Sequence, residues 1–586
     1  MWSGLSKSGS RAKLVVASVC LLGGCAIAPT PPSWFSGSVF EEITNSEEYA
    51  DFLAARYAGM SGQPVAAAGF YRRAFERSPG DPALLERAAF AMLISGETQG
   101  AVAVAQAADP KVATQAPTAQ LALVIDDITM NRGKRALQRL KTTNLGGING
   151  DIAGYLTAWL TAADNADQGL ALLAQLPARR VSAAEQLCIE GLIELQAGRD
   201  DKALEAFAQA SKLPSGAQDI IAGLHAQLVA SSGRDLAAAR QLVLAQVEKS
   251  GATSETDRML TLLEAGEPAP RPKFTLAEGA AFIVYVASSS GVARSSPEMS
   301  TMRNSLVLRL NPDYAPARLA LADALKEEER AEDAIAVLHA VPAGSPWSAE
   351  ARLQEAWLLD GLHRSDEAMA AAAQALVASH RRDILVGVAD LDRLNGSFAD
   401  AKKIYDEIAA ADLSSGQADW RILFARATAS NGLGDWKGAE KDLVAALALE
   451  PDRPELQNYL GYAWVERGEK VKEGMDLIRK AAAARPDQGY IVDSLGWAHY
   501  RLGEYDEAVD NLEHAAELSP SDPEVIDHLG DAYWRAGRET EAQFEWRRAL
   551  KLGSDAKRKA NLREKLDKGL PPRALSSLAD AQRPGQ

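Results

Sequence analysis

Small and apolar residues recur every 34 positions through the C-terminal half of the chain, with charged residues interspersed between them. Leu495-Gly496 recurs as Leu529-Gly530, and Gly503 recurs as Gly537. Two alanines in each interval keep the same frame: Ala508, Ala515, Ala542 and Ala549. Because alanine and leucine favour helices, each interval predicts a helix pair. We expect the first glycine where the two helices pack closely, the second in a left-handed turn between them, and the alanines where the second helix approaches the first.

The same frame extends toward the N-terminus. Matching positions include Leu460-Gly461, Gly468, Ala481, Ala427, Gly434, Ala439, Ala389, Gly396, Ala401, Ala356, Ala368, Ala322, Ala334, Gly191, Gly198, Ala203, Ala55, Gly62 and Ala67. A 34-residue period with small residues at these offsets is typical of the tetratricopeptide repeat (TPR). We count about thirteen units, which predicts an all-α TPR superhelix of helix–turn–helix repeats.

Prolines interrupt this frame. Residues 266–273 have the sequence Gly-Glu-Pro-Ala-Pro-Arg-Pro-Lys, which is incompatible with a helix. The segment that follows matches the repeat poorly. We therefore predict a seam with a degenerate repeat over 266–310, between an N-terminal array, 48–265, and a C-terminal array, 311–553. A long loop inside one unbroken solenoid is the alternative.

The repeats are followed by a strongly charged segment. Residues 554–570 predict a helix that caps the last repeat with a polar face. Residues 571–586 are expected to form a disordered tail.

The first residues of the chain have the layout of a secretory signal. The basic residues Lys7, Arg11 and Lys13 precede the apolar run Leu14–Leu22. That run is too short to span a bilayer as a helix, which favours a cleaved signal over a membrane anchor. It ends in Leu22-Gly23-Gly24-Cys25.

This tetrapeptide resembles the lipobox of bacterial lipoproteins. The resemblance implies that residues 1–24 are a signal peptide, that Cys25 is lipidated, and that 25–47 form a tether. Several acyl chains on one residue anchor a protein stably where one chain does not. Ala26 stands where lipoproteins kept in the inner membrane often carry aspartate. The resemblance therefore implies the outer membrane, with the protein facing the periplasm.

Charge and cysteine content exclude several classes of function. The chain has 63 Lys and Arg against 79 Asp and Glu, a net charge of -16. An acidic protein repels phosphate backbones, so we expect no nucleic-acid partner. Cys20 and Cys25 lie in the leader, which leaves Cys188 alone in the body. A disulfide framework and a cysteine-rich zinc site are thereby excluded, and Cys188 is interpreted as a small core residue.

The sequence offers no convincing catalytic motif. Its seven histidines include no His-Glu-x-x-His pair, and neither a phosphate-binding glycine loop nor a Gly-x-Ser-x-Gly elbow occurs. We therefore expect no enzyme activity, metal or cofactor.

A partner-binding groove is predicted on the first helices of three C-terminal units, which line the concave wall in TPR folds. Its residues are Asn458, Tyr462, Tyr490, Asp493, Trp497, Tyr500, Arg501, Asp527, Asp531, Trp534 and Arg535. Aromatic and arginine side chains are common interface anchors. Trp497 and Trp534 either anchor a partner or pack as core, and the sequence leaves both open. The acidic groups favour a cationic or neutral peptide, and the Lys and Asn clamp of carboxylate-binding TPR proteins is absent.

Residues 310–552 closely resemble a group of proteobacterial TPR lipoproteins. Three motifs carry the resemblance, at Asn458–Tyr462, Tyr490–Trp497 and Asp527–Trp534. One branch of the group is the lipoprotein adaptor of a carboxyl-terminal-processing protease, which tethers the protease at the outer membrane and presents peptidoglycan hydrolases to it.

This resemblance implies an outer-membrane scaffold that binds periplasmic proteins, with a protease and its cell-wall hydrolase substrates as the expected partners. A scaffold for peptidoglycan synthesis, polysaccharide export or outer-membrane assembly is the alternative. The sequence leaves the oligomeric state open.

Overall fold

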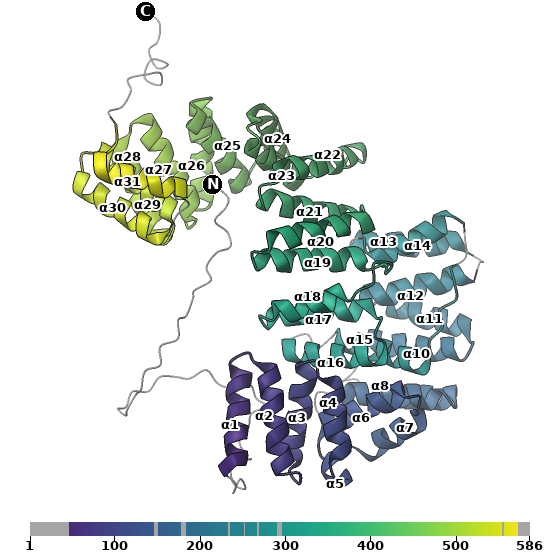
Figure 1. The fold of residues 1–586 in the computed structure, drawn as a ribbon. Coiled ribbons are helices and arrows are strands. Elements are labelled where there is room, and N and C mark those ends of the chain that lie inside the picture. The colour runs from purple at the N-terminus through teal and green to yellow at the C-terminus, as the bar shows by residue number, and fades with distance from the viewer. Residues whose placement is uncertain are drawn as a thin grey trace, which may run out of the picture. The chain divides into compact units, whose positions relative to one another are not determined.

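The computed structural model consists of helices joined by short turns (Figure 1). It describes residues 46–143, 145, 150–176, 183–232, 235–250, 252–266, 269–289, 296–553 and 556–571. Within these ranges no strand occurs, and the prediction of an all-α solenoid is confirmed. The leader, Cys25, most of the predicted tether and nearly all of the predicted tail lie outside the described residues.

The chain divides into two compact units, Met1–Ile384 and Leu385–Gln586. In the first unit successive helices pack as antiparallel pairs, such as α1 with α2 and α19 with α20. Its helices are α1 (Ser46–Met60), α2 (Pro64–Arg77), α3 (Pro82–Ile94), α4 (Thr98–Ala107), α5 (Pro110–Ala113), α6 (Pro117–Thr129), α7 (Gly133–Thr142), α8 (Gly150–Ala162), α9 (Ala166–Ala174), α10 (Ala183–Gln196), α11 (Asp200–Ala210), α12 (Gln218–Ser231), α13 (Leu236–Ser250), α14 (Ser254–Glu264), α15 (Leu276–Ser288), α16 (Pro297–Leu310), α17 (Ala315–Glu327), α18 (Ala331–His339), α19 (Ser348–Gly361) and α20 (Ser365–Ala378).

The division between the units falls inside α21 (Arg382–Leu394). In the second unit α23 pairs with α24, α25 with α26, α27 with α28, and α29 with α30. Its remaining helices are α22 (Phe398–Ser414), α23 (Trp420–Gly432), α24 (Trp436–Leu449), α25 (Pro454–Arg467), α26 (Val471–Ala484), α27 (Gly489–Leu502), α28 (Tyr505–Leu518), α29 (Pro523–Arg535), α30 (Glu539–Leu552) and α31 (Ala556–Lys568).

Glycines occupy the two kinds of position that their spacing predicts, namely left-handed turns and close helix contacts. Gly503 and Gly537 end the first helices of their pairs with φ of 83° and 80°. A Cβ on Gly496 would lie 2.6 Å from Leu512 Cγ, and one on Gly530 would lie 2.5 Å from Trp546 Cδ1. Contacts this short are incompatible with any side chain, so these two glycines set the close approach of first and second helices.

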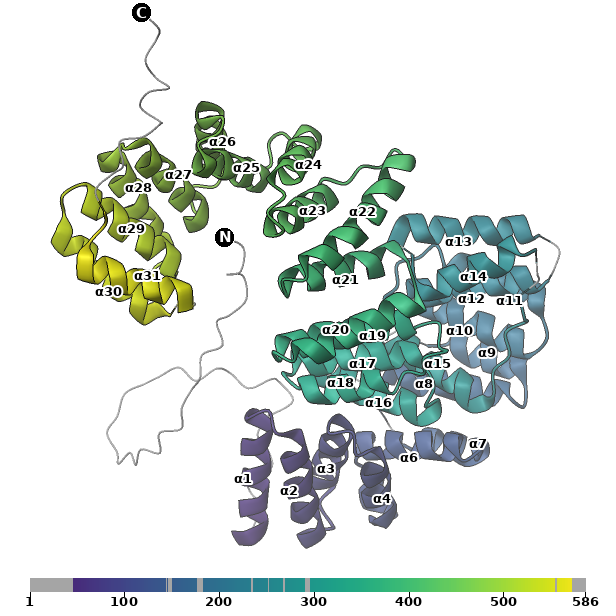
Figure 2. The same cartoon turned by 45° about the horizontal axis from the view of Figure 1, so that its top comes forward.

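The helix pair α15–α16 packs back on the first helices of the N-terminal pairs. Helix α15 contacts α6, α8 and α10, and α16 contacts α3, α4 and α6 (Figures 1 and 2). Nearly every residue of α15 from Gly279 to Ser288 is buried, and Phe282, Ile283 and Val284 join the same apolar core as α3 and α6. Because both faces of this pair are covered, its apolar side chains follow no single stripe, which explains its poor match to the repeat.

Polar contacts fix the position of this pair. The Trp159 indole N–H donates to the carbonyl of Leu276 at 3.0 Å, and Arg309 NH2 lies 2.7 Å from Asp126 Oδ1. A Cβ on Gly279 would lie 2.1 Å from Trp159 Cζ2, so α15 can approach the indole only at a glycine. Helices α15 and α16, which belong to the region predicted as a seam, thus contribute to the core of the first unit, whereas the two units divide between residues 384 and 385.

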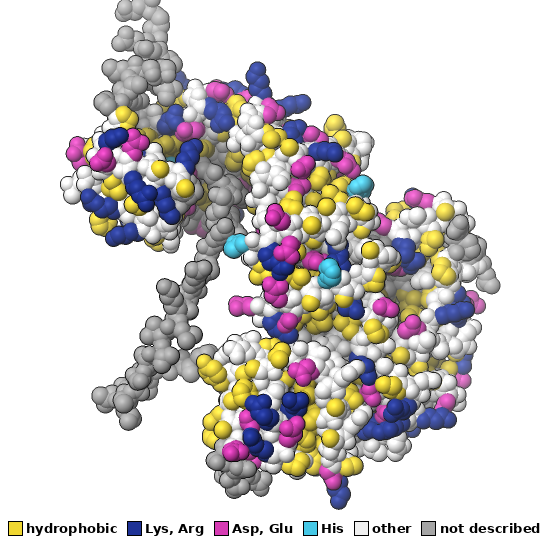
Figure 3. Space-filling model, in the orientation of Figure 1, with side chains coloured by type: hydrophobic (Ala, Val, Ile, Leu, Met, Phe, Trp, Pro, Cys, Tyr) yellow, Lys and Arg dark blue, Asp and Glu magenta, His cyan; other side chains and the backbone are white. Residues whose placement is uncertain are grey.

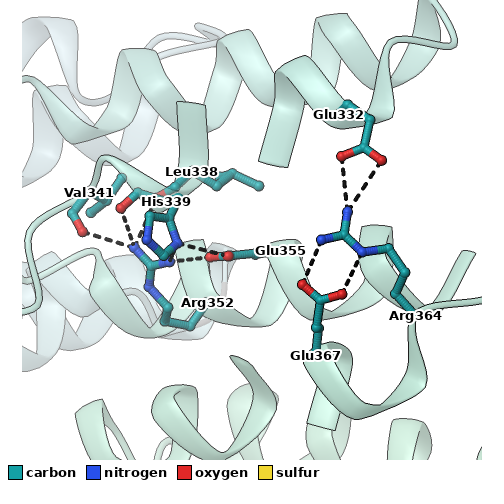
Figure 4. A network of polar contacts seen from close by, with 8 residues as sticks. All are labelled: Glu332, Leu338, His339, Val341, Arg352, Glu355, Arg364 and Glu367. Atoms are coloured by element: carbon teal, nitrogen blue, oxygen red, sulfur yellow. Dashed lines mark hydrogen bonds and ion pairs between the residues drawn. The ribbon is translucent and has the colours of Figure 1, made fainter. Parts of the chain in front are cut away.

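Arginines tie consecutive pairs of the first unit together (Figure 4). The buried guanidinium of Arg352, on α19, donates to the carbonyls of Leu338, His339 and Val341 at 3.0 Å each and pairs with Glu355. These carbonyls end α18, where a helix accepts cationic donors. Nearer the surface, Arg364 bridges two further carboxylates at 3.0 and 2.6 Å: Glu332 and Glu367.

Candidate functional site

The residues predicted to form the groove lie on α25, α27 and α29, the first helices of consecutive pairs in the second unit. Asn458, Asp493 and Asp527 occupy one repeat position on the three helices. Helix α31 continues the frame beyond α29, with Lys565 34 positions after Asp531. The polar side chains of these helices bond mainly to one another, from each first helix to the next.

The junction between α27 and α29 centres on a buried ion pair. His528 Nδ1 lies 2.9 Å from Asp493 Oδ1, and both side chains are nearly inaccessible to solvent. The Trp497 indole stacks on His528 with a centroid distance of 4.0 Å and on Tyr500 with one of 4.6 Å. Trp497 and Tyr500 are half-buried, so these two predicted anchors serve first to join the helices.

Burial opposes both charges of this pair. It raises the pKa of Asp493 and would by itself lower that of His528. The Asp493 carboxylate outweighs that effect and raises the pKa of His528 to about 9. The imidazole is therefore a cation at neutral pH, and the Asp493 carboxyl group is its partner.

The junction between α25 and α27 is held by Glu466 at the end of α25. The Trp497 indole N–H donates to Glu466 Oε2 at 2.8 Å. Arg501 NH1 lies 2.6 Å from the same oxygen, and Arg501 NH2 donates to the Glu466 carbonyl at 2.9 Å. The arginine predicted to contact a partner is thus engaged by the preceding unit.

The junction between α29 and α31 has the same charge arrangement, with the acids on the earlier helix and the cation on the later one. Lys565 Nζ lies 2.7 Å from Asp527 Oδ1 and 2.8 Å from Asp531 Oδ2. Burial would lower the pKa of Lys565, but Asp531 and Asp527 together raise it. Asp531 also accepts the indole N–H of Trp546 at 2.9 Å. The two aspartates are therefore neutralised inside the chain.

The last two predicted groove residues contact the C-terminal end of the described chain. The half-buried Trp534 lies against Trp546, with ring centroids 5.4 Å apart, and beside Gly569, where a Cβ would lie 2.0 Å from its ring. Arg535 NH2 donates to the Pro571 carbonyl at 2.7 Å. Trp534 and Arg535 are covered by the segment that follows α31.

Helix α25 differs from α27 and α29 because two of its buried acceptors have no partner. Neither Glu455 Oε2 nor Asn458 Oδ1 has a hydrogen bond among the described residues, and the Asn458 side chain is on a residue only 7% exposed. The residue that corresponds to His528 one unit earlier is Ser494, whose hydroxyl donates to its own helix, to the Tyr490 carbonyl at 2.9 Å. Asn458 therefore lacks the bond that Asp493 receives.

Two tyrosines of the predicted groove lie at nearby repeat positions. Tyr462 is one helical turn after Asn458 on α25, and Tyr490 occupies on α27 the position that Glu455 occupies on α25. Tyr490, on α27, is 36% exposed. Tyr462, on α25, is mostly buried, and burial together with the nearby Glu466 and Asp493 carboxylates raises the pKa of its hydroxyl. The patch defined by Glu455, Asn458 and Tyr490, called here the α25 patch, is the part of the predicted groove that combines buried acceptors lacking hydrogen bonds with an exposed ring.

Sequence reasoning did not find His528, Lys565, Glu466 or Glu455. Each lies one repeat before or after a predicted residue that it contacts or matches. A signal was available in the sequence. One repeat position holds Asn458, Asp493 and Asp527 in successive units, and the aspartates at that position require cationic partners on the next unit.

No group of three or more His, Cys, Asp and Glu side chains suited to a metal ion occurs in the described ranges. Cys188 is fully buried, and burial raises the pKa of its thiol, as for a core residue. Burial, with a smaller contribution from Lys212, lowers the pKa of His225 to about 4. None of the helices described combines the length and apolarity required to cross a bilayer.

Comparison with known proteins gives a consistent result for the repeats. Residues 496–537 match a family model described as TPR repeat. A TPR repeat-containing protein of Pseudomonas aeruginosa, PA4667, is 37% identical over 90 residues, which span 15% of this chain and 15% of that protein. The matched segment is therefore well below two thirds of the relative's length.

Three solved structures are similar to parts or most of the chain. The APC/C hetero-tetramer Cut9–Hcn1 is 16% identical, covering 90% of this chain and 97% of that one, with a TM-score of 0.35. A TPR protein from Parabacteroides merdae is 14% identical, covering 44% and 98%, with a TM-score of 0.39. MamA from AMB-1 is 25% identical, covering 29% and 96%, with a TM-score of 0.25.

The period of 34, the left-handed turns, the helix pairs and the matched repeat model agree. The chain is a TPR-repeat protein with an all-α superhelical fold, and its repeats indicate a protein–protein interaction scaffold.

Proposed function

We propose that the chain is a scaffold whose second unit binds a segment of a partner protein at the α25 patch. The observation that carries this proposal is the pair of buried acceptors, Glu455 Oε2 and Asn458 Oδ1, left without hydrogen bonds, with the exposed Tyr490 within electrostatic reach of Glu455. A buried acceptor without a partner costs about 1–3 kcal/mol. A partner that supplies N–H donors recovers that cost on binding.

The chemistry of the patch selects the partner. Both orphan atoms are acceptors, and one belongs to a carboxylate, so backbone N–H groups and the cations of lysine or arginine fit. The Tyr490 ring offers a flat apolar surface of the kind that dominates interface energetics. An acidic partner would face uncompensated repulsion from Glu455.

We further propose that the scaffold is lipid-anchored through Cys25 in the outer membrane and faces the periplasm. Its partners would then be cell-envelope proteins, with a protease and its cell-wall hydrolase substrates as the leading class. Support comes from the basic leader, from Leu22-Gly23-Gly24-Cys25 and from the resemblance of residues 310–552 to proteobacterial TPR lipoproteins. The acidic net charge of -16 agrees with a protein partner and disfavours nucleic acid.

Site-specific crosslinking tests the patch. A photoreactive phenylalanine analogue placed at residue 490 should crosslink an envelope protease or cell-wall enzyme, identified by mass spectrometry. The same analogue at Phe544, on α30 of the same unit and 63% exposed, is the control. Equal crosslinking from both positions, or none from residue 490, would place partner binding elsewhere. A peptidoglycan synthase or export component at residue 490 would instead support the alternative scaffold.

The anchor needs its own test. Cys25→Ser should move the protein from the membrane fraction to the soluble fraction and abolish labelling by a fatty-acid analogue. Cys20→Ser, in the leader, should change neither. Membrane retention of the Cys25→Ser protein without label would contradict lipid anchoring.

A further inference from the structure

Helix α31 packs on α30, and its basic side chains pair with carboxylates of α29, whose face bearing those carboxylates is called here the wall of α29. We propose that this wall is a second docking site, specific for a basic amphipathic helix of a partner protein, and that α31 occupies the site until the partner displaces it. The inference rests on the proposed scaffold function and adds a site, a ligand chemistry and a regulating contact to it.

The wall of α29 is acidic and aromatic. Asp527 and Asp531 share Lys565 at 2.7 and 2.8 Å, and Glu524 pairs with Arg558 at 3.3 Å. One turn further, Trp534 lies under Gly569. If nothing covered this helix face, its three carboxylates would repel one another and its indole would expose apolar surface to water. This face therefore requires a cationic cover.

Helix α31 shows which pattern fits the wall. Arg558, Leu562 and Lys565 recur at spacings of four and three, so they lie on one helix face. Leu562 is fully buried in the apolar cluster of Ile526, Leu529 and Trp546. A partner helix with a basic residue, a leucine four positions later and a lysine three positions after that would satisfy the same groups.

The attachment of α31 is weaker than that of the repeats. In the neighbouring α30, Ala542, Glu545, Trp546 and Ala549 are all buried, whereas Leu562 is the single buried residue of α31. Most of its other side chains are charged and solvent-facing, and Figure 3 shows basic side chains gathered over α30 and α31. Few buried apolar contacts and a reliance on ion pairs mark a segment that opens locally at low free-energy cost and is sensitive to salt.

The backbone around α31 allows it to leave without disturbing the last repeat. Gly553, with φ of 93°, precedes α31, and Gly569, with φ of 69°, follows it. Trp546 packs against Gly530 within the last pair, and α31 adds Leu562 to one side of the same apolar cluster. Release of α31 therefore uncovers Asp527, Asp531 and Trp534 while α29 and α30 stay paired.

The test uses the full-length protein with α31 released by substitution. Leu562→Asp/Lys565→Glu removes the buried leucine and reverses the charge facing the two aspartates. Asn561→Asp/Lys557→Glu makes the same change in net charge at two exposed positions of the same helix and is the matched control. The probe is a fluorescent peptide with the sequence of residues 556–571, and circular dichroism verifies that each variant is folded.

We expect the peptide to bind the released variant at least tenfold more tightly than it binds the wild type or the control. Wild-type binding should be weak but saturable, because α31 must first leave. A peptide carrying Lys565→Glu should lose binding, and added salt should weaken it. No binding by the folded released variant would overturn the site, and equal affinity for all three proteins would show that the peptide binds elsewhere.

No measurable binding to the wild type at any peptide concentration would show that α31 is a permanent cap, which also overturns the proposal. These outcomes are independent of crosslinking at residue 490. Failure at the α25 patch leaves the peptide result standing, and failure of the peptide test leaves the α25 patch standing.

Discussion

The indole of Trp497 lies nearly parallel to the imidazole of His528, with ring centroids 4.0 Å apart and planes at 20°. The imidazole is in turn paired with Asp493 at 2.9 Å, so one histidine joins an aromatic stack and an ion pair across two repeats. This contact is the polar and apolar centre of the α27–α29 junction, and it makes the stability of the second unit depend on the charge of His528.

We predict that the second unit loses stability as pH rises from about 6.5 to 9. The pKa of His528 is raised to about 9 in the folded state from an ordinary value of 6.5. A raised histidine pKa contributes stability that is fully present below 6.5 and disappears as pH passes the folded pKa. The loss should be on the order of 1–3 kcal/mol. Urea unfolding at pH 6 and pH 9.5, followed by tryptophan fluorescence, measures it.

The variant His528→Gln should remove most of this pH dependence, whereas His514→Gln, at an exposed position of α28, should retain it. An unchanged slope in His528→Gln would assign the pH dependence to another group.

We predict that Arg352→Met destabilises the first unit by about 3–5 kcal/mol, because it removes the cation buried beside the Glu355 carboxylate and leaves His339 as the remaining partner of that carboxylate. Three carbonyls at the end of α18 also lose their donor. Thermal unfolding measures the effect. The double variant Arg352→Met/Glu355→Met should recover part of the loss. Arg364→Met, in the exposed network of Figure 4, should have a much smaller effect. Equal losses at both arginines would contradict the role of burial.

We predict that Gly279→Ala destabilises the first unit by about 1–3 kcal/mol, since the new methyl group would overlap the Trp159 ring. Gly59→Ala is the matched control, because a Cβ on Gly59 meets nothing within 4 Å. The control should be neutral or stabilise by up to about 1 kcal/mol through helix propensity. Chemical denaturation measures the free energy of unfolding of both variants. An unchanged value for Gly279→Ala would mean that α15 packs less closely on Trp159 than described.

We predict that His363→Gly stabilises the first unit by roughly 0.5–1 kcal/mol. His363 follows α19 with φ of 62°, the left-handed conformation that costs residues with a Cβ about 1–2 kcal/mol. Glycine removes that cost but loses more chain entropy on folding, which leaves a smaller net gain. The reverse change, Gly396→Ala at a turn with φ of 83°, should destabilise. A lower melting temperature for His363→Gly would show that its side chain contributes more than its backbone conformation costs.

The repeat fold could be predicted because its determinants are local. Gly503 and Gly537 mark turns, Gly496 and Gly530 mark close helix pairs, and each requirement is met within one 34-residue interval. The positions of the first helices followed from the same frame. The helix predicted within 554–570 also forms, as α31.

The contacts of the groove residues could not be predicted in the same way. Whether Asp493 faces a partner or His528 depends on a residue 35 positions further along, and whether Asp527 is free depends on Lys565 of α31. The prolines at 266–273 indicated a break in the repeat array, but they carried no information on where α15 and α16 would pack. That depends on Trp159, Asp126 and the apolar surface of α3 and α6, more than one hundred positions away.

The return of α15 and α16 to the first helices of the N-terminal pairs also sets an order in time. During synthesis, α3 and α6 are complete long before residue 310 has been made, and chains grow at roughly 5–20 residues per second. For roughly 10–40 seconds, at those rates, helix α6 lacks the helix pair α15–α16 that packs against it. A solenoid of local repeats could fold as it emerges. This chain must keep its first third from aggregating until its middle arrives, a task suited to a chaperone.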